Sequence, residues 1–266
     1  ALQGGIEGGL AAAELLVGDG NPSGKTVDTF AKSLDDYPST YNFHESRDYV
    51  DYTDDIYVGY RYFETIPGAA EKVVYPFGYG LSYTTFDVET VSAGVVNSNC
   101  TSEANKLYAK VRVTNTGKFS GKEVVQVYIA KPQGKLGKPA KELAAFEKTR
   151  ELQPGESQLM ILTWEINDMA SYDDLGKVKK SAYVLEAGSY DIYVGTSVRD
   201  VTKADYSYIL NHDVITEQLS AKLVPTSLPK RMLADGSYEA LPQSEPVDTD
   251  YSAIGNIDPS LTEGVA

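Results

Sequence analysis

The stretch "LYAKVRVTNTGKFSGKEVVQVYIAK" covers residues 107–131 and decides the fold class. Apolar and polar side chains alternate along two runs in it, and this period of two is typical of half-buried β-strands. The apolar residues on one face are Leu107, Ala109, Val111 and Val113 in the first run, and Val125, Val127 and Ile129 in the second. Asn115-Thr116-Gly117 interrupts the pattern. The stretch therefore predicts two strands joined by a turn.

Five later runs also predict strands: "ELAAFEKTREL", "SQLMILTWEI", "AYVLEAG", "SYDIYVGTS" and "DYSYIL". The segments "LQPGES" and "EAGSY" carry turn residues. About seven strands at this spacing within residues 85–211 predict a mainly β fold, an antiparallel β-sandwich of fibronectin or immunoglobulin type. With a single cysteine, Cys100, the Cys–Trp–Cys pattern of immunoglobulin domains is absent. The fibronectin type III form is therefore favoured.

Residues 1–30 predict one helix and one strand. Leu10 and Leu16 have helical spacing, and Gly18 can end the helix. The other residues of this pattern are Glu7 in the first turn, Ala13 and Val17 on the helix, and Val27 and Phe30 entering the strand. One helix and one strand cannot bury a core. We therefore expect residues 1–30 to be the last helix-strand piece of an α/β sandwich domain whose other strands lie elsewhere.

The segments on either side of the sandwich lack its regular alternation. Residues 31–84 are expected to form an irregular aromatic connector, in which "DIYVGYRYF" (55–63) predicts one strand. Residues 212–266 contain nine acidic and three basic residues with scattered prolines. This composition predicts an acidic linker or tail that lies along a surface or leads to another domain.

Composition excludes several classes of partner. The net charge of −14 argues against nucleic acid and against an anionic membrane surface. No apolar run is long enough for a membrane helix, and no signal segment opens the chain. With one cysteine, these features favour a cytoplasmic location and exclude an internal disulfide. Asn99-Cys100-Thr101 matches a glycosylation sequon, which we interpret as a chance match.

No catalytic or metal-binding motif stands out from the residues alone. His44 and His212 are far apart and lie in irregular segments, so no metal site and no cofactor are expected. Asp54, Asp55 and Glu64 flank an aromatic run that contains Arg61. A structural ion pair with Arg61 is favoured there over a pair of catalytic acids.

Three blocks in order, "EGGLAAAELLVGDGNPSGK", "DIYVGYRYFET" and "YPFGYGLSYTTF", followed by a fibronectin-like sandwich, resemble the C-terminal half of glycoside hydrolase family 3. The resemblance covers roughly residues 4–211. It implies a retaining β-glucosidase in which a barrel supplies an Asp nucleophile. The α/β sandwich domain would supply a Glu acid/base, upstream of the segment that resembles "GGIEGG". No residue of this chain then inherits a catalytic role. The partner would be the barrel-containing remainder of the enzyme, and the substrate a β-glucoside.

Several points stay open within this resemblance. Thr26-Val27 stands where the family commonly has Leu-Pro after the Ser-Gly-Lys turn, which resembles a subgroup whose barrel follows the sandwich. The aromatic stretch at 75–86 is either a wall of the sugar pocket or, as we favour, packing between domains. Tyr60 and Arg61 are the candidates for substrate contact. The rival interpretation is a stand-alone module for stability, dimerisation or carbohydrate binding, and a homo-oligomer stays open.

Overall fold

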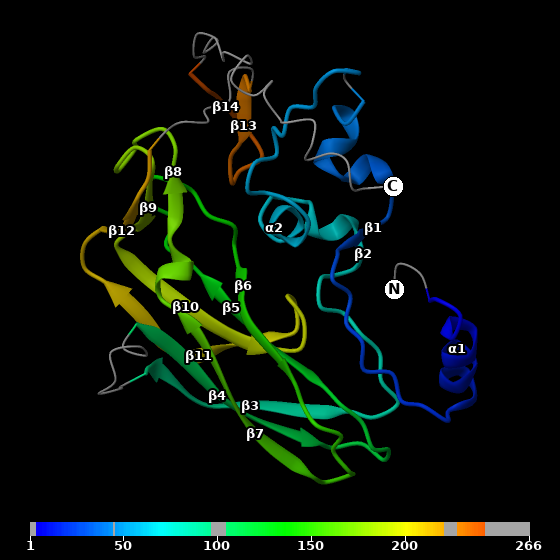
Figure 1. Cartoon of the computed structure of the whole chain (residues 1–266). Coiled ribbons are helices and arrows are strands. Elements are labelled where there is room, and N and C mark those ends of the chain that lie inside the picture. Colours follow the sequence, from blue (N-terminus) through cyan, green and yellow to red (C-terminus); the bar gives the residue numbers. More distant parts are fainter. Residues whose placement is uncertain (1–3, 45, 97–104, 221–227, 243–266) are drawn as a thin grey trace, which may run out of the picture.

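The computed structural model describes residues 4–44, 46–96, 105–220 and 228–242, so the sequon at Asn99 lies outside the described residues. Its centre is the expected antiparallel sandwich (Figure 1). One sheet has the order β3-β4-β7 and the other the order β11-β10-β5-β6. The strands are β3 (Phe86–Val95), β4 (Lys106–Asn115), β5 (Val124–Ala130), β6 (Glu142–Lys148), β7 (Ser157–Glu165), β10 (Gly188–Gly195) and β11 (Val201–Leu210). The mainly β, fibronectin type III-like prediction is confirmed.

The core lies between the two sheets and is built from the apolar faces that the sequence predicts. The alternating residues of β4 and β5 are at most 1% exposed. Trp164 of β7 and Tyr190 of β10 close the same cluster. Each such side chain stabilises the fold by roughly 1.5–3 kcal/mol when buried. The period of two in the sequence therefore corresponds directly to the packed interior.

Strand β5 differs from its neighbours because it is buried on both faces. Gln126 and Tyr128 point away from the core, yet they are 3% and 0% exposed. The connector helps to cover them: Gln126 donates to the Gly78 carbonyl oxygen at 3.4 Å, and the Tyr60 ring lies 6.2 Å from that of Tyr128. Gln126 also donates to the carbonyl oxygen of Thr196, just after β10, at 2.7 Å. The Tyr128 hydroxyl donates to Gln126 Oε1 at 2.5 Å. The connector is thus fastened to the outer face of the second sheet.

The remaining elements are short. The helices are α1 (Gly8–Val17) and α2 (Tyr60–Phe63), and the 3-10 helices are η1 (Leu34–Asp36), η2 (Pro38–Tyr41), η3 (Ala70–Lys72) and η4 (Asn167–Met169). Strand β1 (Phe30–Ala31) pairs with β2 (Val73–Tyr75). A third sheet has the order β12-β9-β8, from β8 (Ser171–Asp173), β9 (Ala182–Leu185) and β12 (Val214–Gln218). No helix of the described residues is long and apolar enough to cross a membrane.

The strand predicted at 55–63 is wrong. Asp55 has a φ of 50° and Gly59 a φ of 56°, and neither value fits an extended strand. Gly59 leads directly into α2, so the aromatic residues that follow it lie on a helical turn. The alternation of residue types in this run came from packing on several sides of a turn, which a pattern of period two cannot distinguish from a strand.

The helix predicted within residues 1–30 is confirmed. It ends at Gly18, whose left-handed φ of 86° lets its N–H reach the carbonyl oxygens of Glu14 and Leu15. None of its residues is buried. Figure 1 shows α1 (blue) at one side of the molecule, apart from the sandwich. The following strand is only β1, which pairs within the connector.

The tail beyond residue 211 contains more pairing than its composition suggests. Strand β12 pairs with β9, and β13 (Lys230–Met232) forms a hairpin with β14 (Tyr238–Ala240). The Met232 N–H donates to the Thr53 carbonyl oxygen at 2.8 Å, so this hairpin contacts the connector. The domain boundaries at 30, 84 and 211 stay predictions.

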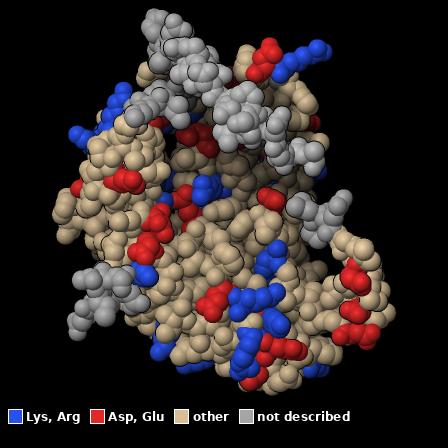
Figure 2. All heavy atoms as spheres, viewed as in Figure 1, with Lys and Arg blue, Asp and Glu red and all other residues tan. Residues whose placement is uncertain are grey.

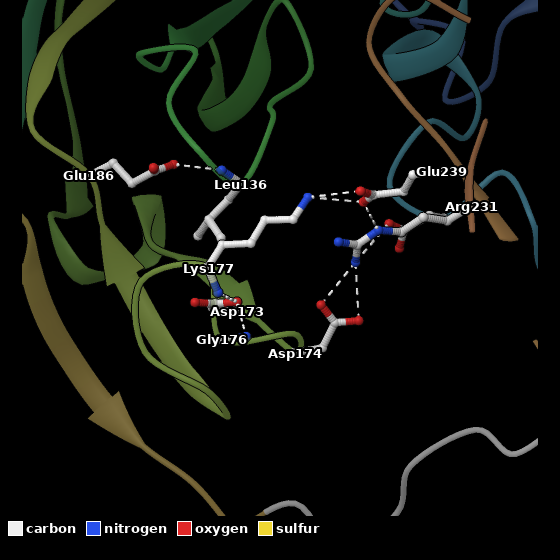
Figure 3. Close-up of polar contacts among 9 residues, drawn as sticks. Leu136, Asp173, Asp174, Gly176, Lys177, Glu186, Arg231 and Glu239 are labelled. Carbon is white, nitrogen blue, oxygen red and sulfur yellow. Dashed lines mark hydrogen bonds and ion pairs between the residues drawn. The ribbon is translucent and has the colours of Figure 1, made fainter. Parts of the chain in front are cut away.

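Arg231 fixes the hairpin electrostatically (Figure 3). Its Nε donates to Glu239 at 2.7 Å within the hairpin, and its Nη1 donates to both carboxylate oxygens of Asp174 at 2.9 and 3.1 Å. Asp55 lies 3.8 Å from the same guanidinium. Lys177 adds contacts of 3.0 Å to Glu239. One guanidinium therefore joins three separate chain segments.

The loop that supplies Asp174 and Lys177 is itself held by Asp173. This carboxylate is 1% exposed and accepts four backbone N–H bonds of 2.7–3.0 Å from residues 176–179. Burial alone would raise the pKa of Asp173, but the four N–H donors outweigh it and lower that pKa below its usual value.

We expect Asp173→Asn to lower the free energy of unfolding at neutral pH by about 2–3 kcal/mol, because an amide cannot accept four N–H bonds. Because the pKa of Asp173 is lower in the folded state than in the unfolded state, the ionised carboxylate stabilises the fold at pH values above the unfolded-state pKa of about 3.9. This stabilisation is lost as the pH falls through the folded-state pKa. The difference between wild type and variant should therefore shrink below about pH 4. Urea unfolding at pH 7 and pH 3 measures it, with the exposed Asp87→Asn as control. A difference that does not change with pH would contradict this prediction.

We expect Arg231→Ala to speed hydrogen exchange at the amides of Met232 and Leu233 by at least about tenfold, because charged hydrogen bonds contribute about 1.5–3 kcal/mol. The amides of β4 should exchange at an unchanged rate. Lys230→Ala is the matched control, since it removes an adjacent cation and leaves the Arg231 contacts in place. Equal exchange in the two variants would show that Arg231 does not hold the hairpin.

Candidate functional site

Tyr60, the first candidate for substrate contact, lies within a cluster of aromatic rings. Its ring centroid is 4.6 Å from that of Phe77 and 6.2 Å from that of Tyr128. Its hydroxyl accepts the Leu143 N–H at 3.0 Å. Both the ring and the hydroxyl of Tyr60 are thus occupied by contacts that join α2 to β5 and β6. This geometry describes a packing residue, and a contact of Tyr60 with substrate stays a prediction.

The aromatic stretch at 75–86 supplies the other half of this packing. The Phe77 carbonyl oxygen accepts the Val198 N–H at 3.1 Å. Gly78 has a φ of 79°, and a Cβ there would lie 2.3 Å from Gln126 Oε1. Gly80 approaches the Gly24 carbonyl oxygen just as closely, so a side chain fits at neither position. Gly78 therefore lets the chain lie close to β5 of the sandwich, and Gly80 lets it lie close to the segment at Gly24.

Arg61, the second candidate, lies on the polar side of α2. Its predicted ion pair with the neighbouring carboxylates is wrong: Arg61 Nη2 is 3.4 Å from Glu142 of β6 instead. Glu64 pairs with Arg199 at 2.8 Å, and Asp55 with Arg231. Asp55 and Glu64 are thus paired with cations from distant segments, whereas Asp54 has no ion pair among the described residues.

Arg61 and Glu142 line a cavity of about 380 Å³ beside η4. Lys131 also pairs with Glu142, and burial lowers the pKa of Lys131 while the Glu142 carboxylate opposes that shift. Trp164 lines the cavity as well, and its buried Nε1 has no hydrogen-bond partner in the described part of the chain. Two cations engage Glu142, and the other acidic residue of the lining, Asp168, is exposed.

A larger cavity, of about 550 Å³, lies within the connector and was missed by the sequence analysis. Tyr37, Phe43 and Tyr52 line it together with Asp51 and Asp54. Asp54 was considered only as an ion-pair partner. The density of aromatic, Asn and Asp residues between 37 and 54 was the available signal, although it equally fits an irregular loop.

The surface of residues 1–30 is the third feature with functional meaning. The side chains expected to need a partner are all exposed: Leu10 (59%), Leu16 (84%), Val17 (72%), Val27 (79%) and Phe30 (52%). A groove of about 460 Å³ separates the end of α1 from Phe119. Tyr83 bridges it by donating to the Leu15 carbonyl oxygen at 2.6 Å. An apolar surface on both sides of a groove is a place for another domain to pack.

The two histidines lie apart. His44 stacks on Phe43 at 3.8 Å between ring centroids, and His212 is an exposed residue after β11. Among the described residues no group of three His, Cys, Asp or Glu side chains is placed to hold a metal ion. On the face seen in Figure 2 basic and acidic side chains are interspersed.

Two family models match the sequence. The model of the glycosyl hydrolase family 3 C-terminal domain matches residues 1–83, and that of the fibronectin type III-like domain matches residues 123–198. The second match falls on the sandwich, from the start of β5 through β10. The first match includes α1 and the connector down to the aromatic stretch.

Relatives cover more of the chain. The chain is 64% identical to Beta-glucosidase A of Butyrivibrio fibrisolvens over 262 residues. This match covers 96% of the chain and 31% of the relative. A beta-glucosidase of Ruminococcus albus is 44% identical over 247 residues, or 91% of this chain and 25% of the relative. The crystal structure of a beta-glucosidase from Paenibacillus barengoltzii superposes with a TM-score of 0.78 at 46% identity, over 90% of this chain and 27% of the other.

The chain therefore spans about a third or less of the length of these relatives. The fold, the two family models and the identity to these relatives all indicate the same family. The chain belongs to glycoside hydrolase family 3, of which it carries the C-terminal portion with the fibronectin type III-like domain.

Proposed function

We propose that this chain is the non-catalytic C-terminal part of a retaining β-glucosidase that hydrolyses terminal β-D-glucosyl residues. The observation that carries the proposal is the 64% identity, over 96% of the chain, to a protein named as a beta-glucosidase. Because that relative is about three times longer, the groups that cleave the glycosidic bond are expected outside these residues.

The carboxylates of the described residues support this division of labour. A retaining mechanism needs two carboxyl groups about 5–5.5 Å apart, one of them able to exchange a proton. Asp55, Asp174 and Glu239 surround Arg231. Glu186 is buried against Lys138 and accepts the N–H groups of residues 135 and 136. These clustered carboxylates already have structural partners.

The exposed apolar side chains of residues 1–30 support a role inside a larger enzyme. Burying one such side chain is worth roughly 1.5–3 kcal/mol, so five left in water forgo about 7–15 kcal/mol. That is comparable to the stability of a whole domain. The barrel-containing remainder of the enzyme is the partner that we propose for this surface. A stand-alone module would be expected to cover it with its own residues.

The first expected result is that the 266-residue chain alone does not hydrolyse 4-nitrophenyl β-D-glucopyranoside. The same chain joined to the barrel-containing remainder should hydrolyse it with retention of configuration, measured by NMR of the released sugar. The whole enzyme at equal molarity is the control. Activity that stays with the isolated chain through a second purification step would contradict the proposal.

A further inference from the structure

Asp54 is a buried acidic residue of the connector whose carboxylate has no partner among the described residues. It is 9% exposed, and no hydrogen bond or ion pair joins its carboxylate to another described residue. Its own backbone N–H is the donor that faces it. Burial raises the pKa of Asp54 and that N–H opposes the shift. A carboxylate that lines a cavity and has no donor from another described residue is free to accept hydrogen bonds from a ligand there.

The walls of the cavity show what such a ligand would contact. Phe43 and Tyr52 are 57% and 77% exposed at its edge, whereas Tyr37 is fixed by an edge-to-face contact of 5.4 Å with Phe63. The Tyr37 hydroxyl donates to the Thr29 carbonyl oxygen at 2.8 Å. Ordered and exposed aromatic rings around one carboxylate form a pocket with apolar faces and a fixed polar anchor.

The polar groups of the cavity distinguish a sugar from a cation. The lining contains no basic side chain, so the ligand must itself donate hydrogen bonds to Asp54 and Asp51. Ser39 and Tyr52 add hydroxyls, which donate as well as accept. A polyhydroxylated ring can bind to both donors and acceptors of the protein, while an ammonium ion can bind only to acceptors. The apolar faces of a pyranose also match the aromatic walls.

The loop is held in a shape that keeps the cavity open. Asn42 Nδ2 donates to the Asp51 carbonyl oxygen at 2.6 Å, which joins the two sides of the segment. Asp54 itself sits next to Thr53, whose carbonyl oxygen accepts the N–H of Met232 from the tail hairpin. The residues that line the cavity are thus fixed from both ends of the connector before any ligand arrives.

We propose that the connector cavity of Tyr37, Phe43, Asp51, Tyr52 and Asp54 binds one pyranose unit of a β-glucoside, with Asp54 accepting hydrogen bonds from neighbouring sugar hydroxyls. The choice of a glucoside among sugars rests on the proposed function. The cavity volume of about 550 Å³ falls within the range of small-molecule sites.

The test measures binding of methyl β-D-glucopyranoside and cellobiose to the 266-residue chain by isothermal titration calorimetry and by NMR shifts. Asp54→Asn should weaken binding by at least about tenfold, since hydrogen bonds to a charged group contribute about 1.5–3 kcal/mol. Tyr52→Ala should weaken it by removing an aromatic wall. Asp48→Asn and Tyr49→Ala, at nearby residues that do not line the cavity, should leave the affinity unchanged.

Melting temperature provides the second readout. If Asp54 serves a ligand, Asp54→Asn removes an uncompensated buried charge and should keep or raise the melting temperature while binding is lost. A fall in melting temperature together with unchanged sugar affinity would overturn the proposal. Binding of tetramethylammonium in place of the sugars would also overturn it, and so would no binding of either sugar.

This outcome is separable from that of the proposed function. Hydrolysis of an aryl glucoside by the whole enzyme, with no sugar binding by the chain, refutes the cavity and leaves the β-glucosidase assignment intact. Sugar binding that is lost in Asp54→Asn supports the cavity even if the whole enzyme prefers another glycoside.

Discussion

The structure depends on the burial of β5 on its outer face. A strand of a sandwich needs only one face in the core, and its other face normally meets water. Here Gln126 and Tyr128 take positions that would be solvated, so the connector must cover them. Their polar atoms are satisfied mainly by Thr196 and by the hydrogen bond between the two side chains. The connector covers them with Phe77, Gly78 and the Tyr60 ring. Without the connector, the outer face of the second sheet would expose the Tyr128 ring and the Gln126 side-chain amide.

This constraint makes the connector and the sandwich one unit. Residues 1–83 and 123–198 match different family models, yet the contacts of α2 and of the aromatic stretch run across that division. Arg231 of the tail hairpin adds a second link, because it pairs with Asp55 of the connector and with Asp174 of the loop after β8. In contrast, α1 touches the rest through Tyr83 and leaves its apolar residues in water. The chain thus combines a packed unit of connector and sandwich with an exposed apolar surface on α1.

The connector cavity follows from the same arrangement. A segment of some fifty residues with short helices cannot bury all its aromatic rings against one sheet face. Tyr37 contacts Phe63 and is held, whereas Phe43 and Tyr52 remain at the surface. Asp54, which lines the same cavity as these two rings, directly precedes the turn at Asp55 that leads toward α2. Packing on β5 therefore places a buried carboxylate next to exposed rings.

The sequence predicted what local patterns control. Alternation found β4 and β5 and the five later strands of the two main sheets and of β9, and Gly18 marked the end of α1. The run "VVQVYIA" in β5 was predicted as a half-buried strand, so the burial of its outer face was not predicted.

The misses concern contacts between distant segments. The partner of Arg61 is Glu142, which no pattern near residue 61 can indicate. The run at 55–63 alternates like a strand but turns at Gly59. Strand β12 was overlooked because its five residues gain their stability by pairing with β9. Ion pairs, turns and edge strands of this kind are set by tertiary contacts that alternation does not record.

Hydrogen exchange of the chain tests most directly whether the connector and the sandwich are one unit. The account predicts that the amide of Val198, which bonds across the junction to the Phe77 carbonyl oxygen, opens with the same free energy as the amides of β4 in the core. It also predicts that Gln126→Leu, which removes the polar link to Gly78, lowers the protection of both parts together. Connector amides that open at a much lower free energy than β4, with no effect of Gln126→Leu on the sandwich, would contradict it.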